Sequence, residues 1–439
     1  MTESTTIRNA PGTAVAEGRS VRSLFASLEV DSRLLGMIVA LVAMGIAFNL
    51  LSDGTFLTAR NLWNLSVQST AVAIMATGMV LVIVSRNIDL SIGSIVVLVA
   101  MSMGLLQNEF LPTVLGQDHP LTWIITLAFG IGLGALIGGL HGFITAYIGV
   151  PSFIVTLGGL LAWRGLAFEL AGGRTIAPLD ATFQLLGGGP RGSLGEMLSW
   201  LVAALAVLAF IYSLIAARRR RRRYGFPLRP RWADITLGAV GSLGVIGMVW
   251  LANSYMWPPA LAKAYAEEHG IAIPPGGLQI PTGIALPVLI LVGIAVAMTF
   301  LATRRRFGRY VYSIGGNPEA AELAGINTRL TIMRTFMLMG VLAAIAAAVI
   351  SGRLNAATVG LGTGAELQVI AAAVIGGTSF AGGIGKITGA VLGAVVMQSL
   401  TSGMVLLNID TPLQDMVLGA VLVSAVALDT ILRRRAKAS

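Results

Sequence analysis

The sequence predicts an all-α, polytopic integral membrane protein with about 12 transmembrane helices. Three observations carry this prediction. Hydrophobic residues make up 55% of the chain and charged residues only 11%, whereas an ordinary soluble domain has roughly 25% charged residues. The mean hydropathy is +0.82. Apolar runs of about 20 residues, long enough to cross a bilayer as a helix, recur along the chain of 439 residues and leave no room for a large soluble domain.

Residues 1–33 form a polar N-terminal arm, which we expect to be cytoplasmic. Within it, residues 19–30 place four apolar side chains at helical spacing beside two arginines, as in a short helix lying on the membrane surface. A partly disordered arm is the alternative. The first apolar run, 34–51, has no Ala-x-Ala cleavage signal, so we expect it to remain as a span.

The transmembrane domain is predicted to cover residues 34–432, with a basic cytoplasmic tail at 433–439. Its spans are expected at 34–51, 62–84, 92–106, 122–148, 152–171, 198–217, 233–252, 284–303, 332–352, 366–384, 388–407 and 414–432. Basic residues flanking spans stay on the cytoplasmic side. Most of the 30 Lys and Arg residues lie in cytoplasmic segments if the N-terminus is inside. We therefore expect both termini to be cytoplasmic.

The loop 218–232 carries the densest positive charge, the run Arg218–Arg223. Because the loop lies between two spans, we interpret it as a cytoplasmic anchor on anionic lipids and expect no nucleic acid as a partner. On the other side, residues 253–283 are rich in Pro and Gly and are expected to form the longest outer loop.

Glycines recur every four residues in two of the predicted spans. In lipid, such stripes let helix backbones approach closely and drive helix association. They comprise Gly130, Gly134, Gly138 and Gly142 in one span, and Gly385, Gly389 and Gly393 at the start of another. His141 lies beside the first stripe, where we expect an interhelical hydrogen bond and no ligand.

The composition excludes several kinds of chemistry. There is no Cys, which excludes disulfides, thiolate metal sites and a cysteine nucleophile. The three His are far apart and show no metal-ligand spacing. The nearest candidate for a phosphate-binding loop, Gly385-Lys386-Ile387, lacks the upstream glycine and the Ser/Thr that such a loop needs. We therefore expect no catalytic residue, metal or cofactor in this chain, and any nucleotide to bind to another one.

The inner loop 304–331 is predicted to contain a short helix. Asn317 can cap it and Pro318 suits its first position. Glu319 and Glu322 favour its positive N-terminal end, and Gly325 can terminate it about two turns later.

A helix of two turns is marginal by itself in water, so a partner surface is expected to hold this one. Its face of Ala320, Leu323 and Ala324 is small and apolar and suits a groove. The alternative is a connector that folds onto its own bundle.

Ionisable residues near the spans are candidates for a polar pathway. Asp89 would cost about 2.5–3.5 kcal/mol in mid-span unless paired, and we expect Arg86 to be its partner; a hydrated position at a span end is the alternative. Glu366 suits equally the first turn of a helix opening near residue 366. The candidates for pathway or polar bundle contacts are Asn87, Asp89, Ser91, Arg164, Glu169, Glu366 and Gln368.

Several blocks of the sequence resemble the permease subunits of ATP-binding-cassette importers. Glu319-Ala320-Ala321, then three residues and Gly325, matches the EAA-x-x-x-G loop of that family. Other blocks resemble its monosaccharide branch: Asn87–Ser94, Pro151–Gly159, Ile314–Asn327 and Val374–Ala390. The length and the extra pair of spans at 198–252 most resemble the permeases for D-xylose.

The resemblance implies a bacterial inner-membrane permease that imports a monosaccharide, D-xylose first, by alternating access. It implies a core of about ten spans, similar to the vitamin B12-type importers, plus the extra pair. The implied partners are a second copy of the chain, a cytoplasmic ATPase subunit that binds ATP and Mg²⁺, and a periplasmic sugar-binding protein. Residues 304–331 would then be the coupling loop, with its short helix as the coupling helix. The chain itself would not be an enzyme.

Two other functions stay open. A proton-coupled secondary sugar transporter also has about twelve spans and both termini inside, but it needs titratable groups deep in the bundle. A membrane-embedded glycosyl- or acyltransferase needs paired carboxylates or a histidine near a membrane face, and Glu267-Glu268-His269 is the cluster that would have to supply them.

Overall fold

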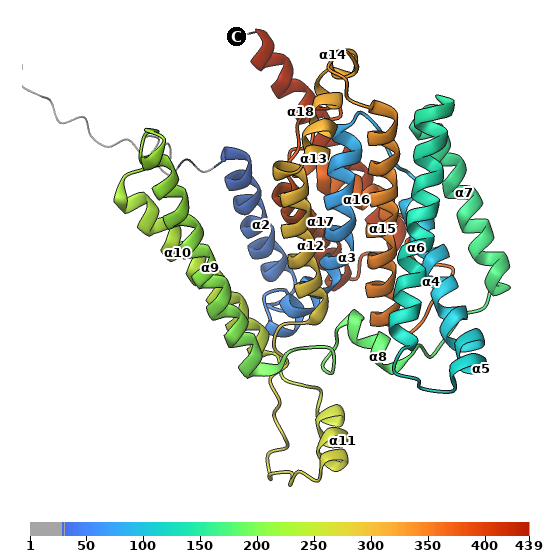
Figure 1. Ribbon diagram of the computed structural model, residues 1–439. Helices are drawn as coiled ribbons and strands as arrows, with labels where there is room; N and C mark the ends of the chain where they lie inside the picture. Colours follow the sequence, from blue (N-terminus) through green and yellow to red (C-terminus); the bar gives the residue numbers. More distant parts are fainter. Residues whose placement is uncertain (1–28, 30, 439) are drawn as a thin grey trace, which may run out of the picture.

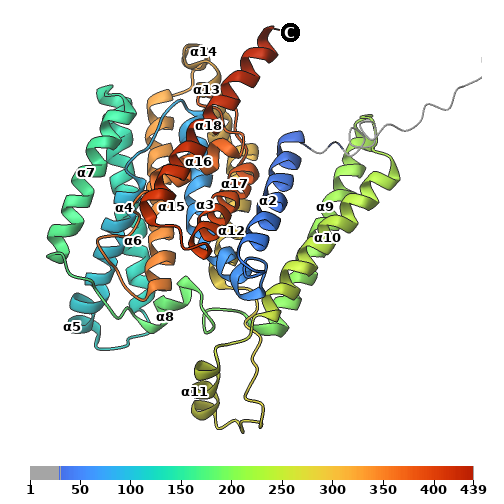
Figure 2. The same ribbon diagram turned by 180° about the vertical axis from the view of Figure 1, so that it is seen from behind.

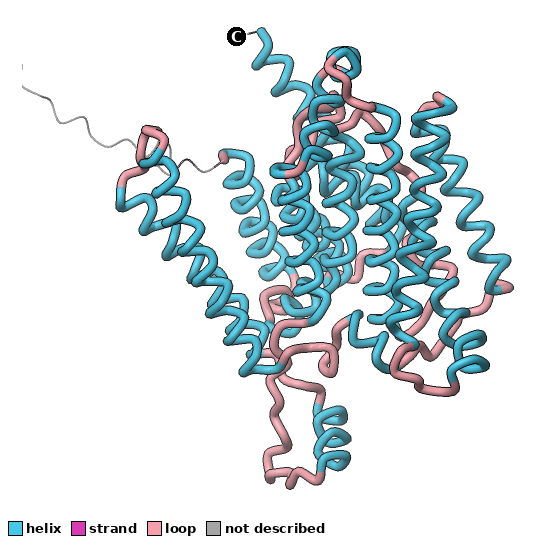
Figure 3. The backbone as a smooth tube through the Cα atoms, viewed as in Figure 1, coloured by secondary structure: helices cyan, strands magenta, loops and turns pink. Residues whose placement is uncertain are grey.

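The computed structural model describes residue 29 and residues 31–438. The described part is helical and contains no β-strand, only three isolated bridges (Figure 3). The α-helices are α2 (Ser32–Leu51), α3 (Ala59–Val84), α4 (Ile92–Leu105), α5 (Leu111–Leu115), α6 (Thr122–Phe143), α7 (Ser152–Ala171), α8 (Ala181–Gln184), α9 (Gly195–Arg223), α10 (Arg231–Ser254), α11 (Pro259–His269), α12 (Leu286–Arg304), α13 (Arg306–Gly316), α14 (Pro318–Leu323), α15 (Thr328–Leu354), α16 (Ala365–Ile375), α17 (Ile387–Leu406) and α18 (Thr411–Ala438). The all-α prediction is confirmed.

Ten helices in the described part are long and apolar enough to cross a membrane. They coincide with ten of the predicted spans, because twenty apolar residues in a row leave the backbone no way to satisfy its polar groups in lipid except as a helix. Two of these segments, Ile92–Leu115 and Thr122–Ile148, are extended by π-helical turns.

The segment predicted as a span at 366–384 is not one continuous helix. Helix α16 ends at Ile375, and residues 376–386 form a loop. Gly377 has φ +92°, a left-handed conformation that stops a helix. The loop begins buried, at Gly376, Thr378 and Ser379. Its backbone is paired, since Ser379 N donates to Ile384 O at 2.9 Å and Gly383 N donates to Val84 O at 3.0 Å. The apolar sequence is split here between a short helix and a loop, and it returns the chain from the end of α15 to the end of α3 at Val84. The last predicted span, 414–432, falls within α18.

Helix α3 forms the centre of the bundle and is almost entirely buried (Figure 1). Helices α15 and α17 pack along it, and α4 and α6 pack on α15. Both glycine stripes lie at contacts of this kind. A Cβ on Gly134 or Gly138 would overlap backbone carbonyls of α15, and one on Gly389 or Gly393 would overlap carbonyls at or next to α16. The predicted close approach of helices is confirmed.

Helices α9 and α10 are the extra pair. They pack on each other and diverge from the bundle towards one end (Figures 1 and 2). At the other end the pair is attached, because Ala252 of α10 packs against Trp63 and Val67 of α3. Trp63 Nε1 also donates to the Gly283 carbonyl at 2.9 Å.

The two ends of the bundle carry different segments. The start of α2, the α9–α10 connection, α14 and the end of α18 lie at one end, and α5, α8 and α11 lie at the other (Figures 1 and 2). Helix α11 belongs to the predicted long outer loop, from which it projects. The helix predicted for residues 19–30 lies outside the described residues, except for Glu29.

Candidate functional site

Helix α14 begins as the sequence predicts. The Asn317 side chain accepts a hydrogen bond from the backbone N of Ala320 at 3.1 Å, and Pro318 occupies the first helical position. An N-cap of this kind satisfies one of the amide groups that have no partner within the helix.

The end of α14 is a Schellman motif centred on Gly325, whose φ is +78°. Gly325 N donates to Glu322 O at 2.9 Å, and Ile326 N donates to Ala321 O at 3.0 Å. This pair of hydrogen bonds needs a left-handed residue, which glycine adopts without steric cost. The predicted helix and both of its ends are confirmed.

Helix α14 projects from the end of the bundle (Figure 1). Ala321 is its buried anchor, at 4% exposure, and Glu322 accepts a hydrogen bond from Thr328 Oγ1 at 2.6 Å. The opposite face is free: Leu323 is 91% exposed, with Ala320 and Ala324 exposed beside it. An apolar side chain that protrudes in this way suits insertion into a groove of another surface.

Helix α13 precedes α14 and was not predicted. Its buried residues, Gly308, Val311, Ile314 and Gly315, form one face, and Arg306, Arg309 and Tyr310 lie on the exposed side. The signal was present in the sequence, since Phe307, Val311 and Ile314 recur with the spacing of one helix face. The three arginines before this stretch conceal the pattern.

The C-terminal end of α13 is clamped by a junction, which we define as residues 84–86, 312–316 and 382–385. A Cβ on Gly315 would overlap the Val84 carbonyl, so the two backbones are in direct contact. Arg86 donates from Nε to Gly315 O at 2.8 Å and from Nη2 to Gly316 O at 2.9 Å. A guanidinium on the carbonyls of a helix C-terminus also faces the negative end of the helix dipole.

Tyr312 completes the junction by donating its phenol hydrogen to Gly385 O at 2.7 Å. Burial raises the pKa of this phenol, which keeps it a donor. Helices α3, α13 and the segment before α17 are therefore held together by hydrogen bonds at one point. A force on α14 would reach α3 and α17 through α13.

The predicted Arg86–Asp89 pair is wrong, because Arg86 is used by the junction. Asp89 is buried at 1% exposure and accepts from Ser91, from N at 2.9 Å and from Oγ at 2.6 Å. Ser91 Oγ lies 3.2 Å from Nδ1 of His141 on α6. Trp163 Nε1 on α7 donates to His141 Nε2 at 2.8 Å.

These bonds assign a tautomer to His141. Trp163 can only donate, so Nε2 accepts, and the proton of a neutral imidazole lies on Nδ1 and points at Ser91. The Ser91 hydroxyl in turn donates to Asp89, and the chain of donors ends on the carboxylate. The interhelical hydrogen bond predicted for His141 is confirmed. Asn87 lies beside this chain and donates to Ser85 O at 2.9 Å.

A second polar group lies further along α7. Arg164 Nη1 donates to Thr363 Oγ1 at 2.8 Å, in the loop that enters the bundle before α16. Glu366 stands in the first turn of α16, as its capping alternative predicts. Within the described residues, Arg164 Nε and Glu366 Oε2 are buried atoms without a hydrogen-bond partner. Arg164 and Glu366 therefore keep hydrogen-bonding capacity that no described residue uses.

The structure does not bring the other candidates into either group. Glu169 is exposed near the end of α7, and Gln368 is half-buried on α16. The cluster Glu267-Glu268-His269 lies on α11, where Glu268 pairs with Arg191 at 3.3 Å and the His269 ring stacks on Tyr265. The contact of Thr363 with Arg164 was not predicted, because nothing in the sequence of a glycine-rich loop distinguishes a threonine that binds a distant side chain.

Known proteins similar to the chain are permeases. Residues 61–426 match the family described as the branched-chain amino acid transport system / permease component. The xylose transport system permease protein XylH of Escherichia coli (strain K12) is 38% identical over 401 residues, covering 91% of this chain and 92% of the relative. XylH of Haemophilus influenzae is 35% identical, covering 93% and 98%.

More distant relatives have the same extent. The galactose/methyl galactoside import permease protein MglC of Escherichia coli (strain K12) is 28% identical over 92% of this chain and 95% of its own length. No solved structure matches the chain. The family match spans the bundle from α3 to α18, including the junction and α14, and the chain therefore belongs to this family of transport-system permease components.

Proposed function

We propose that this chain is the membrane-spanning subunit of an ATP-driven, binding-protein-dependent importer of a monosaccharide, with D-xylose as the first candidate. The observation that carries the proposal is α14, a capped, protruding helix with an almost fully exposed leucine, on a permease with relatives, 35–38% identical, that are named for xylose transport. A permease that contained its own energy source would not need to present such a surface.

In this proposal two copies of the chain enclose the pathway in a bacterial inner membrane. The end of the bundle with α14, the start of α2 and the end of α18 faces the cytoplasm, and α11 faces the periplasm. The basic α9–α10 connection lies at the α14 end, as basic segments lie on the cytoplasmic side. A cytoplasmic ATPase binds ATP and Mg²⁺ and docks on α14. A periplasmic sugar-binding protein delivers the substrate at the opposite end. The chain binds no cofactor itself.

The junction supplies the route from ATPase to pathway. Closure of the ATPases moves α14, and α13 transmits the movement as a rigid element to α3 and to the segment before α17. The hydrogen bonds of Arg86 and Tyr312 keep the helices from sliding past one another. The bundle then alternates between outward- and inward-open states.

Arg164 and Glu366 are the proposed pathway residues with the best structural support. Their buried, unpaired atoms are free to accept and donate hydrogen bonds to sugar hydroxyls in another state of the cycle. Asp89 Oδ1 accepts both hydrogen bonds from Ser91, and the Ser91 hydroxyl also contacts His141, so we assign these residues to the bundle.

Uptake in proteoliposomes tests the proposal. The purified chain, the candidate ATPase and the candidate binding protein are reconstituted with ATP inside and no proton gradient, and radiolabelled xylose is followed. Uptake that needs ATP and both partners is the expected result. Uptake by this chain alone with a proton gradient would favour the secondary transporter, for which Asp89 and His141 would be the titratable groups.

The docking of α14 is tested by Leu323→Asp. Leu323 is 91% exposed, so its replacement leaves folding unchanged to within about 0.5 kcal/mol. We expect loss of ATPase copurification and of uptake. Leu228→Asp is the matched control, an exposed leucine in the α9–α10 connection, which lies at the same end as α14. Equal copurification of both variants would remove α14 as the docking site.

A further inference from the structure

Helices α9 and α10, each long and apolar enough to span a membrane, form an apolar groove of about 420 Å³. Its walls include exposed apolar side chains: Ile215 is 46% and Ile235 70% accessible. Gly238 widens the groove, since its missing side chain would lie 3.7 Å from Leu214 Cδ1 on the opposite wall. Apolar walls that are open to the bilayer contact lipid chains and not water.

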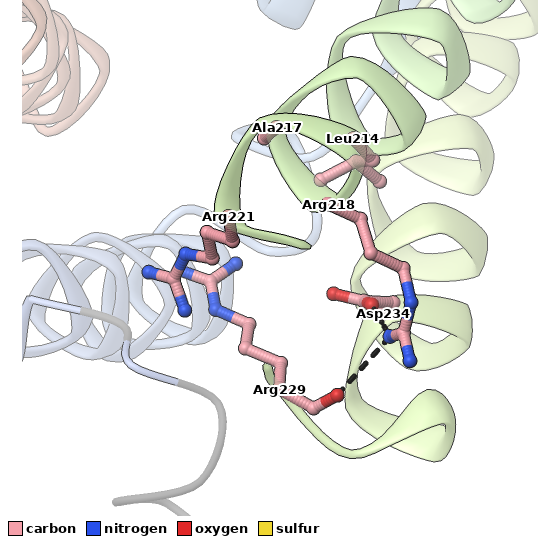
Figure 4. Close-up of a pocket in the computed structure, with 6 residues that line it drawn as sticks. All are labelled: Leu214, Ala217, Arg218, Arg221, Arg229 and Asp234. Atoms are coloured by element: carbon pink, nitrogen blue, oxygen red, sulfur yellow. Dashed lines mark hydrogen bonds and ion pairs between the residues drawn. The ribbon is translucent and has the colours of Figure 1, made fainter. Parts of the chain in front are cut away.

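The groove ends in arginines at the α9–α10 tip. A second hollow of about 70 Å³ lies there, lined by Leu214, Ala217, Arg218, Arg221, Arg229 and Asp234 (Figure 4). Arg218 belongs to both hollows and pairs with Asp234, donating also to Arg229 O at 3.1 Å. In Figure 4 the Arg221 and Arg229 side chains run side by side, away from this pair. The apolar groove thus opens directly onto a cluster of guanidinium groups.

The arginines of the tip outnumber the carboxylates that pair with them. Arg221 and Arg229 share the Glu29 carboxylate, at 2.6 and 3.0 Å. Hydrogen bonds from these two arginines lower the pKa of Glu29 to about 2, so it is charged at neutral pH. There are eight arginines between positions 218 and 231, and the carboxylates that pair with them among the described residues are Glu29 and Asp234, which leaves an excess of six positive charges in that part of the chain.

We propose that the α9–α10 pair binds one anionic phospholipid, with its phosphate at Arg218 and Arg229 and one acyl chain in the groove. Guanidinium groups bind phosphate through paired hydrogen bonds. Among the described contacts Arg229 donates from its side chain only through Nε and Arg218 only through Nη1, so each keeps donors for a phosphate. Tyr224, Phe226 and Trp232 are exposed around the tip, as aromatic residues are at the headgroup level.

The two hollows together select this ligand class. A soluble phosphate would occupy the arginines and leave the apolar groove empty, whereas a neutral lipid would fill the groove and leave the charge excess uncompensated. An anionic phospholipid fills the groove and compensates the charge. Its phosphate lies at the membrane surface, as the arginines do, and its acyl chain extends into the membrane along the groove. This site does not depend on which solute the bundle carries.

Native mass spectrometry of the full chain in detergent measures the binding. Phosphatidylglycerol, phosphatidylcholine and glycerol 3-phosphate are titrated separately. We expect one phosphatidylglycerol to be retained, with at least about tenfold preference over phosphatidylcholine, and no retained glycerol 3-phosphate. Equal retention of the two lipids, or binding of the soluble phosphate in place of lipid, would overturn the proposal.

Two pairs of variants locate the site. Replacing Arg218 and Arg229 together by Gln should weaken phosphatidylglycerol binding about 30-fold, taking about fivefold for each arginine near a lipid phosphate. Arg329→Gln, at an exposed arginine in the first turn of α15, should change it less than twofold. Gly238→Leu fills the groove and should lower retention at least about fivefold, whereas Gly247→Leu, which has open space around it, should not.

A cross-linking experiment on the unaltered protein covers the case in which a variant fails to fold. Phosphatidylglycerol with a diazirine in its acyl chain is photolysed with the reconstituted chain, and the labelled peptides are sequenced. Label concentrated on residues 211–218 and 234–242 supports the site. Label spread over the lipid-facing helices, or an effect of Arg329→Gln as large as that of the double variant, would show binding by net charge alone and refute it.

Discussion

The contact of Gly315 with the end of α3 predicts a large effect from a single methyl group. A Cβ at position 315 would lie 2.5 Å from Gly383 N and would overlap the Val84 carbonyl. Because carbon contacts are most favourable at about 3.5–4.0 Å, Gly315→Ala must displace α13 by about 1 Å or more. Such a shift takes the two hydrogen bonds from Arg86, at 2.8 and 2.9 Å, beyond useful range. Hydrogen bonds to charged groups contribute about 1.5–3 kcal/mol each, so the local loss is about 3–6 kcal/mol.

Amide hydrogen exchange of α13 measures that loss directly. A loss of 3 kcal/mol in the opening free energy lowers protection at least about 100-fold. Gly316→Ala is the matched control, because it is the next residue and has no atom within 4 Å of the added methyl. If both variants keep the protection of the native chain, the junction does not hold α13. If only Gly315→Ala loses protection but uptake remains coupled to ATP, the junction is structural and does not transmit the movement.

Three other perturbations test other parts of the structure. Gly134→Ala should sharply lower the yield of folded protein, because its methyl would overlap the α15 backbone, whereas Gly132→Ala, with open space around it, should leave the yield unchanged. Asp89→Leu should lower the melting temperature in detergent by an amount equivalent to about 2–6 kcal/mol, since two buried donors of Ser91 lose their acceptor at about 1–3 kcal/mol each. The Lys386 ammonium holds the pKa of Asp31 below 3.8. This pair therefore stabilises the fold above pH 3.8 by about 1 kcal/mol or less, and the stabilisation is lost as the pH falls further. The melting temperatures of the native chain and of Asp31→Asn should converge below pH 3.8.

The parts of the fold that follow from local chemistry could be predicted. Runs of twenty apolar residues specify helices in lipid, and ten of them were placed correctly. Helix α14 was predicted to the residue at its start because Asn317 and Pro318 act on their own backbone neighbours. The end of α14 was predicted because glycine adopts the left-handed conformation that position 325 requires. Each of these signals is complete within a few residues of the chain.

The errors have one physical origin, which is that the deciding partner lies far away in sequence. Arg86 was assigned to Asp89, three residues away, but its acceptors are carbonyls of Gly315 and Gly316. The stretch 366–384 is as apolar as a span, but the carbonyl of Val84 pairs with its loop and makes a non-helical backbone tolerable in the interior. Hydropathy predicts that a segment is removed from water, but it does not distinguish a segment that faces lipid from one that is buried in protein.

The extra helix pair is held at its two ends by different forces. Away from the tip, Trp63 and Ala252 pack the pair against α3. At the tip, where α9 and α10 diverge from the bundle, the attachment runs through ion pairs: Glu29 binds Arg221 and Arg229, and Asp31, two residues on, binds Lys386 at 2.5 Å. Lys386 follows Gly385, which accepts the hydrogen bond from Tyr312 of α13. Glu29 and Asp31 therefore link the basic tip to the junction by ion pairs. A lipid phosphate on Arg229 would lie at the Glu29 end of this link, and α13 lies at the other end.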